Sequence, residues 1–593
     1  MHSASAILAQ STIRSESNVS KIIHPYWQHN CNLDSFRHVS FVQYLLNILS
    51  GNHSHQKIIE YETKKICTYE NLGRYIRKTA TILKKIIPTG EFVVFIGQNS
   101  FEYLALYFGA ICIGAIPMNL PYDNISLQDI RTFIIQHNVQ YLVLNIDHSN
   151  EFNLVIIRKL LNSIAQIKVK IFLYGYLNTN NDLIDDEKII YLGDWLNSDS
   201  NEIDQLFKPI NVVTVPCLAL NSNGTHQWPP RLFLHNHFSL IATCEMLADG
   251  RIFEFRSIDK LLVYGSFEHL ENLLMFISAI VNGCSFILVP GYDYVHIIDA
   301  IVRYRIYSAI LPSNFLIKLL KDTGHNVILE NLIKIISFGG KISSILCQNF
   351  FHRFPNVRSI RHCYIMAETP CPITMLIRNS NDYDSAGFPL PNTQIKIHSL
   401  ADYDDEMLEA NCCGLIAVGR EQNMFAIGYI SNNSSRIIEL NFQHLTDHSK
   451  ADKHHFHRQR WLITQDMGFY DENGLIYLHG QYRNSSSELN SIVQQSRIET
   501  YLLNHPLIAE AYVIETDTSS KKCAALVSLK FVNTYLTPEL NQQIANYIKE
   551  NVADLDEFFL FVRYNLPKTN CGRYIDSLIR KEIFNLINLE KKF

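Results

Sequence analysis

The sequence has no excess of charge of either sign. Its 593 residues include 52 Lys and Arg against 57 Asp and Glu, which gives a formal net charge of -5. A chain this close to balance lacks the strong positive field with which proteins hold nucleic acids or anionic membranes. The composition therefore favours a small molecule as the ligand, and we expect no nucleic-acid partner.

Cysteine is present, but not at the spacings of metal sites or disulfide frameworks. The 13 cysteines include no C-x-x-C pair, and Cys412 and Cys413 are the only two that are close in sequence. This pattern predicts buried reduced thiols, a reducing compartment and hence a cytoplasmic protein. The histidine clusters at 235–237 and 454–457 lack a second ligand group at zinc spacing, so we interpret them as exposed loop histidines rather than metal ligands.

Long apolar runs are also missing. Residues 1–21 lack the apolar core of a secretory signal, and the apolar stretches at 92–116 and 273–290 are interrupted by polar residues and glycine. A helix that crosses a bilayer needs about 20 mainly apolar residues. We therefore expect these stretches to form buried strands and helices, with no membrane span.

What the sequence does have is the composition of a large globular protein, with 47% hydrophobic and 18% charged residues. A chain of 593 residues exceeds what one hydrophobic core usually organises, so it should form several compact units. From Tyr69 onward, helical spacing at 69–86 is followed by a short apolar run at 91–97 and by helical spacing again at 101–115. This alternation predicts an α/β fold with crossover helices, whose ligands bind near the ends of the strands.

A boundary is expected near the C-terminal end. The stretch 476–515 passes from a strand pattern through a serine-rich segment into a helix and another strand. The polar segment is typical of a hinge, and about a hundred residues follow it. We predict an N-terminal extension at 1–60, a large domain at 61–479 and a small domain at 480–593.

One loop raises the possibility of a phosphate site. After an apolar strand the sequence reads LNSNGTHQWPPR at residues 220–231. Small polar residues beside a glycine can present backbone N–H groups to phosphate oxygens. On its own this motif is weak, and an ordinary surface turn is the better interpretation of it.

Several further stretches follow this loop in a familiar order. They read SFGGKISS, FPNVRSIRHCYIMAETP, AGFPLPNTQIKI, GLIAVG, WLITQDMGFYDENGLIYLHGQ, RIETYLLNHPLIAEAYVI and LPKTNCGRYIDSLIRKEI. Their content, order and spacing resemble the acyl-adenylate-forming superfamily of acyl-CoA and aryl-CoA ligases, luciferases and adenylation domains. The resemblance implies a large N-terminal region of two α/β subdomains plus a β-rich subdomain, followed by a small mobile α+β C-terminal domain.

The resemblance also implies a reaction and its partners. ATP and a carboxylic acid would give an acyl-adenylate and pyrophosphate with the help of Mg²⁺, and a thiol of CoA or of an acyl carrier protein would then take the acyl group. Asp466 matches the aspartate that binds both ribose hydroxyls, Tyr364 the aromatic residue that stacks on adenine, and Glu368 the magnesium ligand. A turn aspartate and a core tyrosine are the structural alternatives for the first two.

The remaining roles follow from the same motifs. Thr225, Glu368 and Arg573 take catalytic positions, and Arg483 takes the hinge position. The nucleotide-binding set comprises Ser222, Asn223, Gly224, Thr225, Gly339, Gly340, Tyr364, Asp466 and Gln481.

Six positions depart from the family pattern. Ile365 and Ala367 replace a glycine and a threonine, Gln227 and Pro230 replace a glycine and a lysine, Gln481 replaces an arginine, and Arg573 replaces the lysine that bridges the substrate carboxylate and the α-phosphate. Several of these changes remove a cation, a hydroxyl or backbone freedom near phosphate. Two functions stay open, namely an acid–thiol ligase with weakened catalysis and a non-catalytic nucleotide- or acyl-binding module of the same fold.

Overall fold

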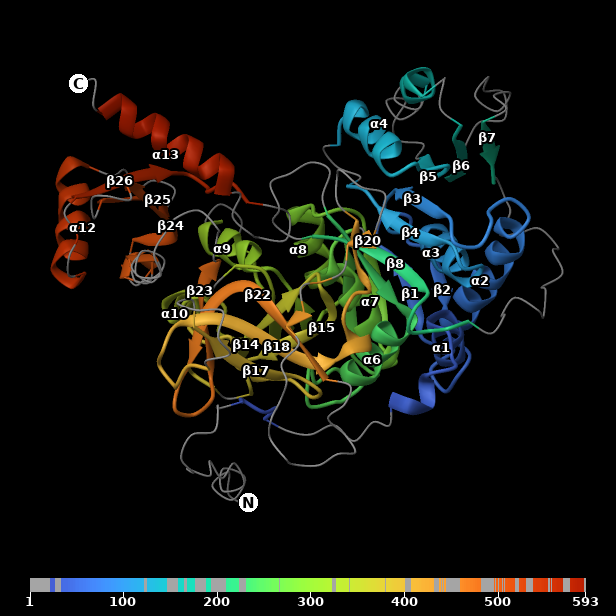
Figure 1. Ribbon diagram of the computed structural model, residues 1–593, viewed down its shortest axis with the longest axis horizontal. Coiled ribbons are helices and arrows are strands. Elements are labelled where there is room, and N and C mark those ends of the chain that lie inside the picture. The colour runs from blue at the N-terminus through green and yellow to red at the C-terminus, as the bar shows by residue number, and fades with distance from the viewer. Residues whose placement is uncertain are drawn as a thin grey trace, which may run out of the picture.

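The computed structural model describes residues 22–590 with gaps. The residues outside the description within that span are 27–32, 122–124, 147–157, 165–167, 176–187, 193–209, 223–230, 266, 323–326, 341, 379, 400–406, 431–436, 439, 441, 444–458, 482–494, 496–497, 500, 504, 506, 518–521, 530–536, 553–554, 556 and 569–575. The histidine cluster at 454–457 therefore lies outside the described residues. Figure 1 shows the β3–β7 sheet at one end of the molecule and the C-terminal elements at the other.

The first layer is a parallel sheet with the order β4-β3-β5-β6-β7. Its strands are β3 (Phe92–Ile96), β4 (Ile116–Asn119), β5 (Tyr141–Ile146), β6 (Lys170–Gly175) and β7 (Ile189–Tyr191). The accompanying helices are α2 (Tyr69–Leu83), α3 (Phe101–Cys112) and α4 (Leu127–Gln136). Helix α3 starts where the Ser100 side chain accepts the Tyr103 N–H at 3.1 Å, a side-chain cap that satisfies one otherwise unpaired donor.

The second layer consists of two neighbouring sheets with the orders β10-β11-β1-β2 and β12-β13-β14-β15-β16. The first contains β1 (Lys57–Glu60), β2 (Ile66–Thr68), β10 (Lys260–Tyr264) and β11 (Ser285–Val289). The second contains β12 (Ser308–Ile310), β13 (Lys334–Ser337), β14 (Ser359–Met366), β15 (Thr369–Met375) and β16 (Phe388–Pro389). Their helices are α6 (His237–Leu247), α7 (Leu270–Val281), α8 (Tyr294–Arg303), α9 (Ser313–Lys321) and α10 (Ser344–Arg353).

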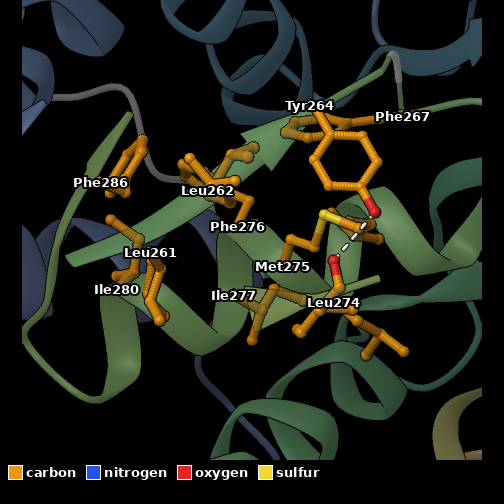
Figure 2. Close-up of a cluster of buried hydrophobic side chains, with 14 of the residues drawn as sticks. Leu261, Leu262, Tyr264, Phe267, Leu274, Met275, Phe276, Ile277, Ile280 and Phe286 are labelled. Carbon is orange, nitrogen blue, oxygen red and sulfur yellow. Dashed lines mark hydrogen bonds between the residues drawn. The ribbon is translucent and has the colours of Figure 1, made fainter. Parts of the chain in front are cut away.

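The main core forms where α7 packs on β10 and β11. Figure 2 shows Leu261 and Leu262 of β10 in one cluster with Phe276 and Ile280 of the helix, and all four side chains are buried. The Tyr264 hydroxyl donates to the Ile310 carbonyl at 2.9 Å, which ties the end of β10 to β12. The apolar stretch at 273–290 is thus a buried helix and strand, as the sequence predicts.

Helix α1 (Phe41–Leu49) and strand β1 belong to the same core although they precede residue 61. Strand β1 pairs in parallel with β11, with Ile58 opposite Phe286. Buried Phe41 and Leu45 of α1 join the main hydrophobic cluster. The core therefore continues upstream of the predicted start of the large domain.

Two antiparallel sheets form the β-rich part. One has the order β8-β9-β19-β20, from β8 (Pro216–Asn221), β9 (Leu232–Asn236), β19 (Gly428–Ile430) and β20 (Ile437–Ile438). The other has the order β17-β18-β22-β21, with β23 paired to β22, from β17 (Gln394–His398), β18 (Gly414–Glu421), β21 (Phe442–Gln443), β22 (Gln459–Tyr470) and β23 (Ile476–Gln481). Two short 3-10 helices lie at Leu33–Phe36, where Leu33 and Phe36 pack against the main core, and at Gln422–Met424.

The C-terminal unit has a separate sheet. Its order is β24-β25-β26, formed by β24 (Ile508–Asp517), β25 (Lys522–Leu529) and β26 (Glu557–Arg563). Helices α12 (Pro538–Asn551) and α13 (Asp576–Glu590) contribute to two small hydrophobic clusters on this sheet. The α/β body, the β-rich part and the small α+β unit match the predicted fold class.

Candidate nucleotide site

The structure joins Tyr364 and Asp466, which are 102 residues apart in sequence, by a direct contact. The Tyr364 hydroxyl on β14 donates to Oδ2 of Asp466 on β22. Burial, reinforced by the neighbouring Asp466 charge, raises the pKa of Tyr364 well above its usual value, so the hydroxyl stays a donor. The Tyr364 side chain is only 7% exposed and packs in the hydrophobic cluster of the β-rich part. The sequence motifs predicted both residues, but not their contact.

Strand β22 fixes the position of Asp466 through its backbone. The Asp466 N–H donates to Oγ1 of Thr464 at 3.1 Å, and that hydroxyl donates to the Ile416 carbonyl at 2.8 Å. In the neighbouring strand β23, Gln481 lies opposite Asp466. The structure thus brings the predicted positions 466 and 481 together at one edge of the sheet.

Gly480 occupies a conformation that explains why glycine stands there. Its φ is +127°, a value that side-chain-bearing residues rarely adopt. The β22–β23 register also shifts between Met467 and Gly468. Both features adjust the direction of β23 directly before Gln481.

The turn between β14 and β15 carries Ala367 and Glu368. Nε2 of His235 donates to the Ala367 carbonyl at 3.0 Å, and the Ala426 N–H donates to the Glu368 carbonyl at 2.8 Å. His235 is fully buried, and burial lowers its pKa to about 3 despite the hydrogen bond to Ala367. The neutral ring, donating through Nε2, therefore holds the turn at neutral pH.

Our prediction of exposed histidines at 235–237 is wrong. His235 lies near the end of β9, and His237 is the first residue of α6. The two residues are 0% and 1% exposed. Nδ1 of His237 accepts the Phe41 N–H at 3.2 Å, which connects α6 to the start of α1. The two side chains point into the protein because β9 and α6 are both covered by other elements, which a local pattern does not reveal.

The two predicted departures in β14 lie inside the protein. Ile365 and Ala367 are 2% and 4% exposed. The pairing of β14 with β15 shifts between Tyr364 and Met366, at Ile365. This irregularity ends the regular strand just before the turn that carries Glu368.

Gly339 and Gly340 follow β13 at the same sheet edge as Tyr364. Strands β13 and β14 are parallel, with Ser337 opposite His362, so continuing this register places Gly339 beside Tyr364 and Gly340 beside Ile365. Gly339 has φ +93°, which again favours glycine. Positions 339, 340 and 364 therefore meet where ligands of parallel sheets bind.

The base of the predicted phosphate loop is a hairpin between β8 and β9. The Ser222 N–H donates to the Arg231 carbonyl at 2.8 Å, which brings the two ends of the loop together. The Arg231 guanidinium lies 5.4 Å from the Tyr429 ring centre, on β19. The loop residues Asn223, Gly224, Thr225, Gln227 and Pro230 lie outside the described residues, as do Arg483 and Arg573.

Arg420 is a buried residue of this region that the sequence analysis missed. Its guanidinium, on β18, donates to Oγ1 of Thr393 at 2.7 Å and to Oγ1 of Thr369 at 2.7 Å. It also donates to the carbonyls of Cys371 and Pro372. An arginine inside the apolar stretch GLIAVGR could have indicated such a role. Thr369 directly follows Glu368, so Arg420 helps to fix the turn.

Within the described ranges, no cluster of three or more His, Cys, Asp or Glu side chains is arranged to hold a metal ion. Across the same ranges, no helix has the length and apolar character needed to cross a membrane.

Comparison with known proteins agrees with this architecture. Residues 229–429 match the model of the AMP-binding enzyme family. A probable CoA ligase of Humulus lupulus is 23% identical over 485 residues, covering 79% of each chain. A 4-coumarate-CoA ligase of Narcissus pseudonarcissus is 21% identical over 547 residues, covering 89% of this chain and 90% of the relative.

Solved structures show the same fold. An anthranilate CoA ligase in complex with anthranoyl-AMP superposes with a TM-score of 0.72 at 16% identity, covering 93% of this chain and 99% of that one. A benzoate CoA ligase from Burkholderia xenovorans LB400 superposes with a TM-score of 0.71 at 15% identity, covering 91% of this chain and 99% of that one. The chain therefore contains a segment that matches the AMP-binding enzyme family, has the fold of these CoA ligases, and is similar in sequence to CoA ligases over most of its length.

Proposed function

We propose that the protein is an ATP-dependent ligase that activates a carboxylic acid as its acyl-adenylate for transfer to a thiol. The observation that carries this proposal is the contact between Tyr364 and Asp466, which places an aromatic ring and a carboxylate together at one strand edge. Gly339 and Gly340 reach the same edge by the register of β13 and β14. These groups suit the adenosine part of a nucleotide.

Each group has a defined task in this proposal. The Asp466 carboxylate has about four acceptor sites, so it can bind both ribose hydroxyls while it accepts from Tyr364. The Gln481 position faces Asp466 across β22 and β23. The backbone at Gly339 and Gly340 can approach the nucleotide closely because neither residue carries a side chain.

Glu368 fits a magnesium site of the kind that needs few protein ligands. Mg²⁺ is usually held by one or two carboxylates together with substrate phosphates and waters. The Glu368 carboxylate, on a turn fixed through Ala367 and Ala426, is compatible with that arrangement. When bound, the ion would neutralise phosphate charge.

The proposed chemistry has two displacement steps. A substrate carboxylate oxygen attacks the α-phosphorus of ATP and pyrophosphate leaves; the sulfur of a thiol then attacks the acyl carbon, AMP leaves and the thiol loses its proton. We assign Arg573 and Thr225 to stabilise charge on the α-phosphate, without a covalent bond to the protein. The thiol would come from CoA or an acyl carrier protein, in the cytoplasm.

The burial of Ile365 and Ala367 favours a second candidate function. Both side chains are packed away at the strand end where the family has a glycine and a threonine. No hydroxyl is available there to bind phosphate. A protein that binds AMP or an acyl-adenylate without turnover would keep Tyr364 and Asp466 but would not need the phosphate-binding glycine and threonine at positions 365 and 367.

Two measurements separate these candidates. Carboxylate-dependent exchange of labelled pyrophosphate into ATP tests turnover, and the panel should begin with 4-coumarate, benzoate and anthranilate, the acids named in the similar proteins. Exchange with at least one acid supports the ligase, and AMP binding without exchange supports the binding module.

Titration calorimetry with AMP tests the site itself. Asp466→Ala should weaken binding by about 2 to 4 kcal/mol, the value of two charge-assisted hydrogen bonds. The matched control is Glu472→Ala, because Glu472 is an exposed acid in the turn after the same strand. Equal affinity in the wild type and Asp466→Ala would remove Asp466 from the site.

A further inference from the structure

A buried lysine of the body is bound by the C-terminal unit. Lys321 is the last residue of α9, and its side chain is 5% exposed. Its ammonium group donates to Oε2 of Glu510 at 3.1 Å, to Oγ of Ser528 at 2.8 Å and to the Tyr564 carbonyl at 3.0 Å. A fourth acceptor, Oδ1 of Asn565, lies at 3.3 Å. All four acceptors belong to the C-terminal unit.

Glu510 has a second partner inside its own unit. Nζ of Lys568 lies 2.8 Å from Oε1 of Glu510, and the two side chains are 8% and 5% exposed. Burial would raise the pKa of Glu510, but Lys568 and Lys321 together hold it at about 2. The C-terminal unit therefore carries a neutral Glu510–Lys568 pair of its own, and Lys321 adds one further positive charge from the body.

The rest of this contact is incompletely filled. A cavity of about 280 Å³ lies beside the lysine, lined by Tyr292, Tyr294 and Phe315 of the body and by Asn565 and Leu566 of the unit. Close packing therefore contributes less here than in the two hydrophobic clusters of the unit. The four buried hydrogen bonds of Lys321 therefore add a polar contribution to the attachment beside this cavity.

We propose that Lys321 is a latch that docks the C-terminal unit on α9, and that the unit separates from the body when this lysine leaves its four acceptors. Lys321 donates to residues 564 and 565, which shortly precede Lys568 in the sequence.

Lys321→Met is the direct test, because it removes the four hydrogen bonds of Lys321 to the C-terminal unit and leaves the Glu510–Lys568 pair intact. Truncating one partner of a buried, hydrogen-bonded charge pair usually costs binding a factor of roughly 30 or more. We expect the docking equilibrium to fall by that factor. Small-angle X-ray scattering of the full chain should then show a larger radius of gyration, and amide exchange should accelerate in the last turn of α9 and at residues 564–566.

The matched control is Lys318→Met, one turn earlier on α9. Lys318 lies 4.3 Å from the Tyr294 ring centre, at the cavity but outside the Lys321 contacts. This variant should keep the radius of gyration of the wild type. Equal scattering and exchange in Lys321→Met and wild type would overturn the proposal.

Amide exchange in α12 distinguishes undocking from unfolding. Ile544 and Ile548 of this helix are fully buried in the core of the unit, away from Lys321. Their protection should be unchanged in Lys321→Met. Its loss would show that Lys321 supports the fold of the unit instead of its docking, and would also overturn the latch. No readout needs a nucleotide, so the result is independent of the proposed reaction.

Discussion

Tyr364 is the residue whose role the structure makes most specific. Its hydroxyl is engaged with Asp466, so the ring and the hydroxyl can be tested separately. If the ring stacks on adenine, Tyr364→Phe should bind AMP within about threefold of the wild type, whereas Tyr364→Ala should lose about 1 to 3 kcal/mol, the usual value of base–aromatic stacking. Titration calorimetry measures both. Equal losses in the two variants would assign the effect to the hydroxyl and its hold on Asp466.

At the level of residues, motifs in the sequence can suggest a role for a side chain, but they do not show what surrounds it. Asp466, Tyr364 and Gln481 were assigned by motif, and the structure places all three at one edge. The buried setting of His235 was not predicted, because it depends on the turn at Ala367, which is 132 residues away. Arg420 was missed for the same reason, since its acceptors come from other strands.

Strand β18 illustrates how one buried residue ties elements together. Arg420 is 1% exposed and donates to acceptors near β15 and β17. Arg420→Met keeps a long side chain but leaves several buried acceptors without a donor. The free energy of unfolding should therefore be about 3 to 5 kcal/mol lower than in the wild type. Urea denaturation followed by fluorescence measures this change.

The control for this variant is Arg378→Met. The Arg378 side chain is 69% exposed and lies 3.8 Å from a Glu254 oxygen. An exposed ion pair of this kind contributes at most about 1 kcal/mol. A loss in Arg420→Met no larger than in Arg378→Met would contradict a bridging role for Arg420.

The loop between β8 and β9 carries the clearest prediction about nucleotide preference. Its ends are held by the Ser222–Arg231 hydrogen bond, so changes within it should leave β8 and β9 paired. Restoring a glycine and a cation by Gln227→Gly with Pro230→Lys should strengthen ATP binding by about 1 to 3 kcal/mol, the scale of a charged hydrogen bond. AMP, which lacks the outer phosphates, should bind nearly as before.

Competition calorimetry with ATP and AMP measures this preference on one protein preparation. The single variant Gln227→Gly is the matched control, because it restores backbone freedom without the charge. If the double variant changes the affinity for neither ATP nor AMP, or if the wild type already prefers ATP strongly over AMP, this loop is not a weakened phosphate-binding loop.

At the level of elements, the sequence predicted strands and helices well but not their pairing. The apolar run at 91–97 contains β3, and the helical pattern at 69–86 contains α2. The pairing of β1 with β11 joins segments more than 200 residues apart. Beside this pairing, the backbone N–H of Lys57 donates to Oγ of Ser285. Local periodicity carries no information on such long-range partners.

At the level of the whole molecule, the separate hydrophobic clusters of the C-terminal unit agree with two parts that fold as distinct cores. The exact boundary at Gly480 stays a prediction, since residues 482–494 lie outside the described residues. The serine-rich polar segment of the sequence predicts a hinge at this place. It could not reveal the attachment by Lys321, because that residue comes from α9, 189 residues before Glu510.

Three buried neutral histidines should make the whole molecule sensitive to mild acid. Burial lowers the pKa of His137 to about 4, of His235 to about 3 and of His237 to about 4. Each folded-state pKa lies below the unfolded value of about 6.5, so the unfolded chain binds more protons as the pH falls. Stability is therefore retained above about pH 6.5 and lost toward pH 4, by up to about 1.4 kcal/mol per pH unit for each histidine.

Urea midpoints measured from pH 7.5 down to pH 5 test this expectation before most carboxylates titrate. His235→Gln should keep a donor to the Ala367 carbonyl but take up no proton, so the acid dependence should fall by about one third. His352→Gln is the control, since His352 is exposed on α10. Protonation of His237 would also remove the acceptor for the Phe41 N–H and so weaken the link between α6 and α1. An unfolding midpoint that does not change between pH 7 and pH 5, or an unaltered acid dependence in His235→Gln, would show that these buried rings do not control acid stability.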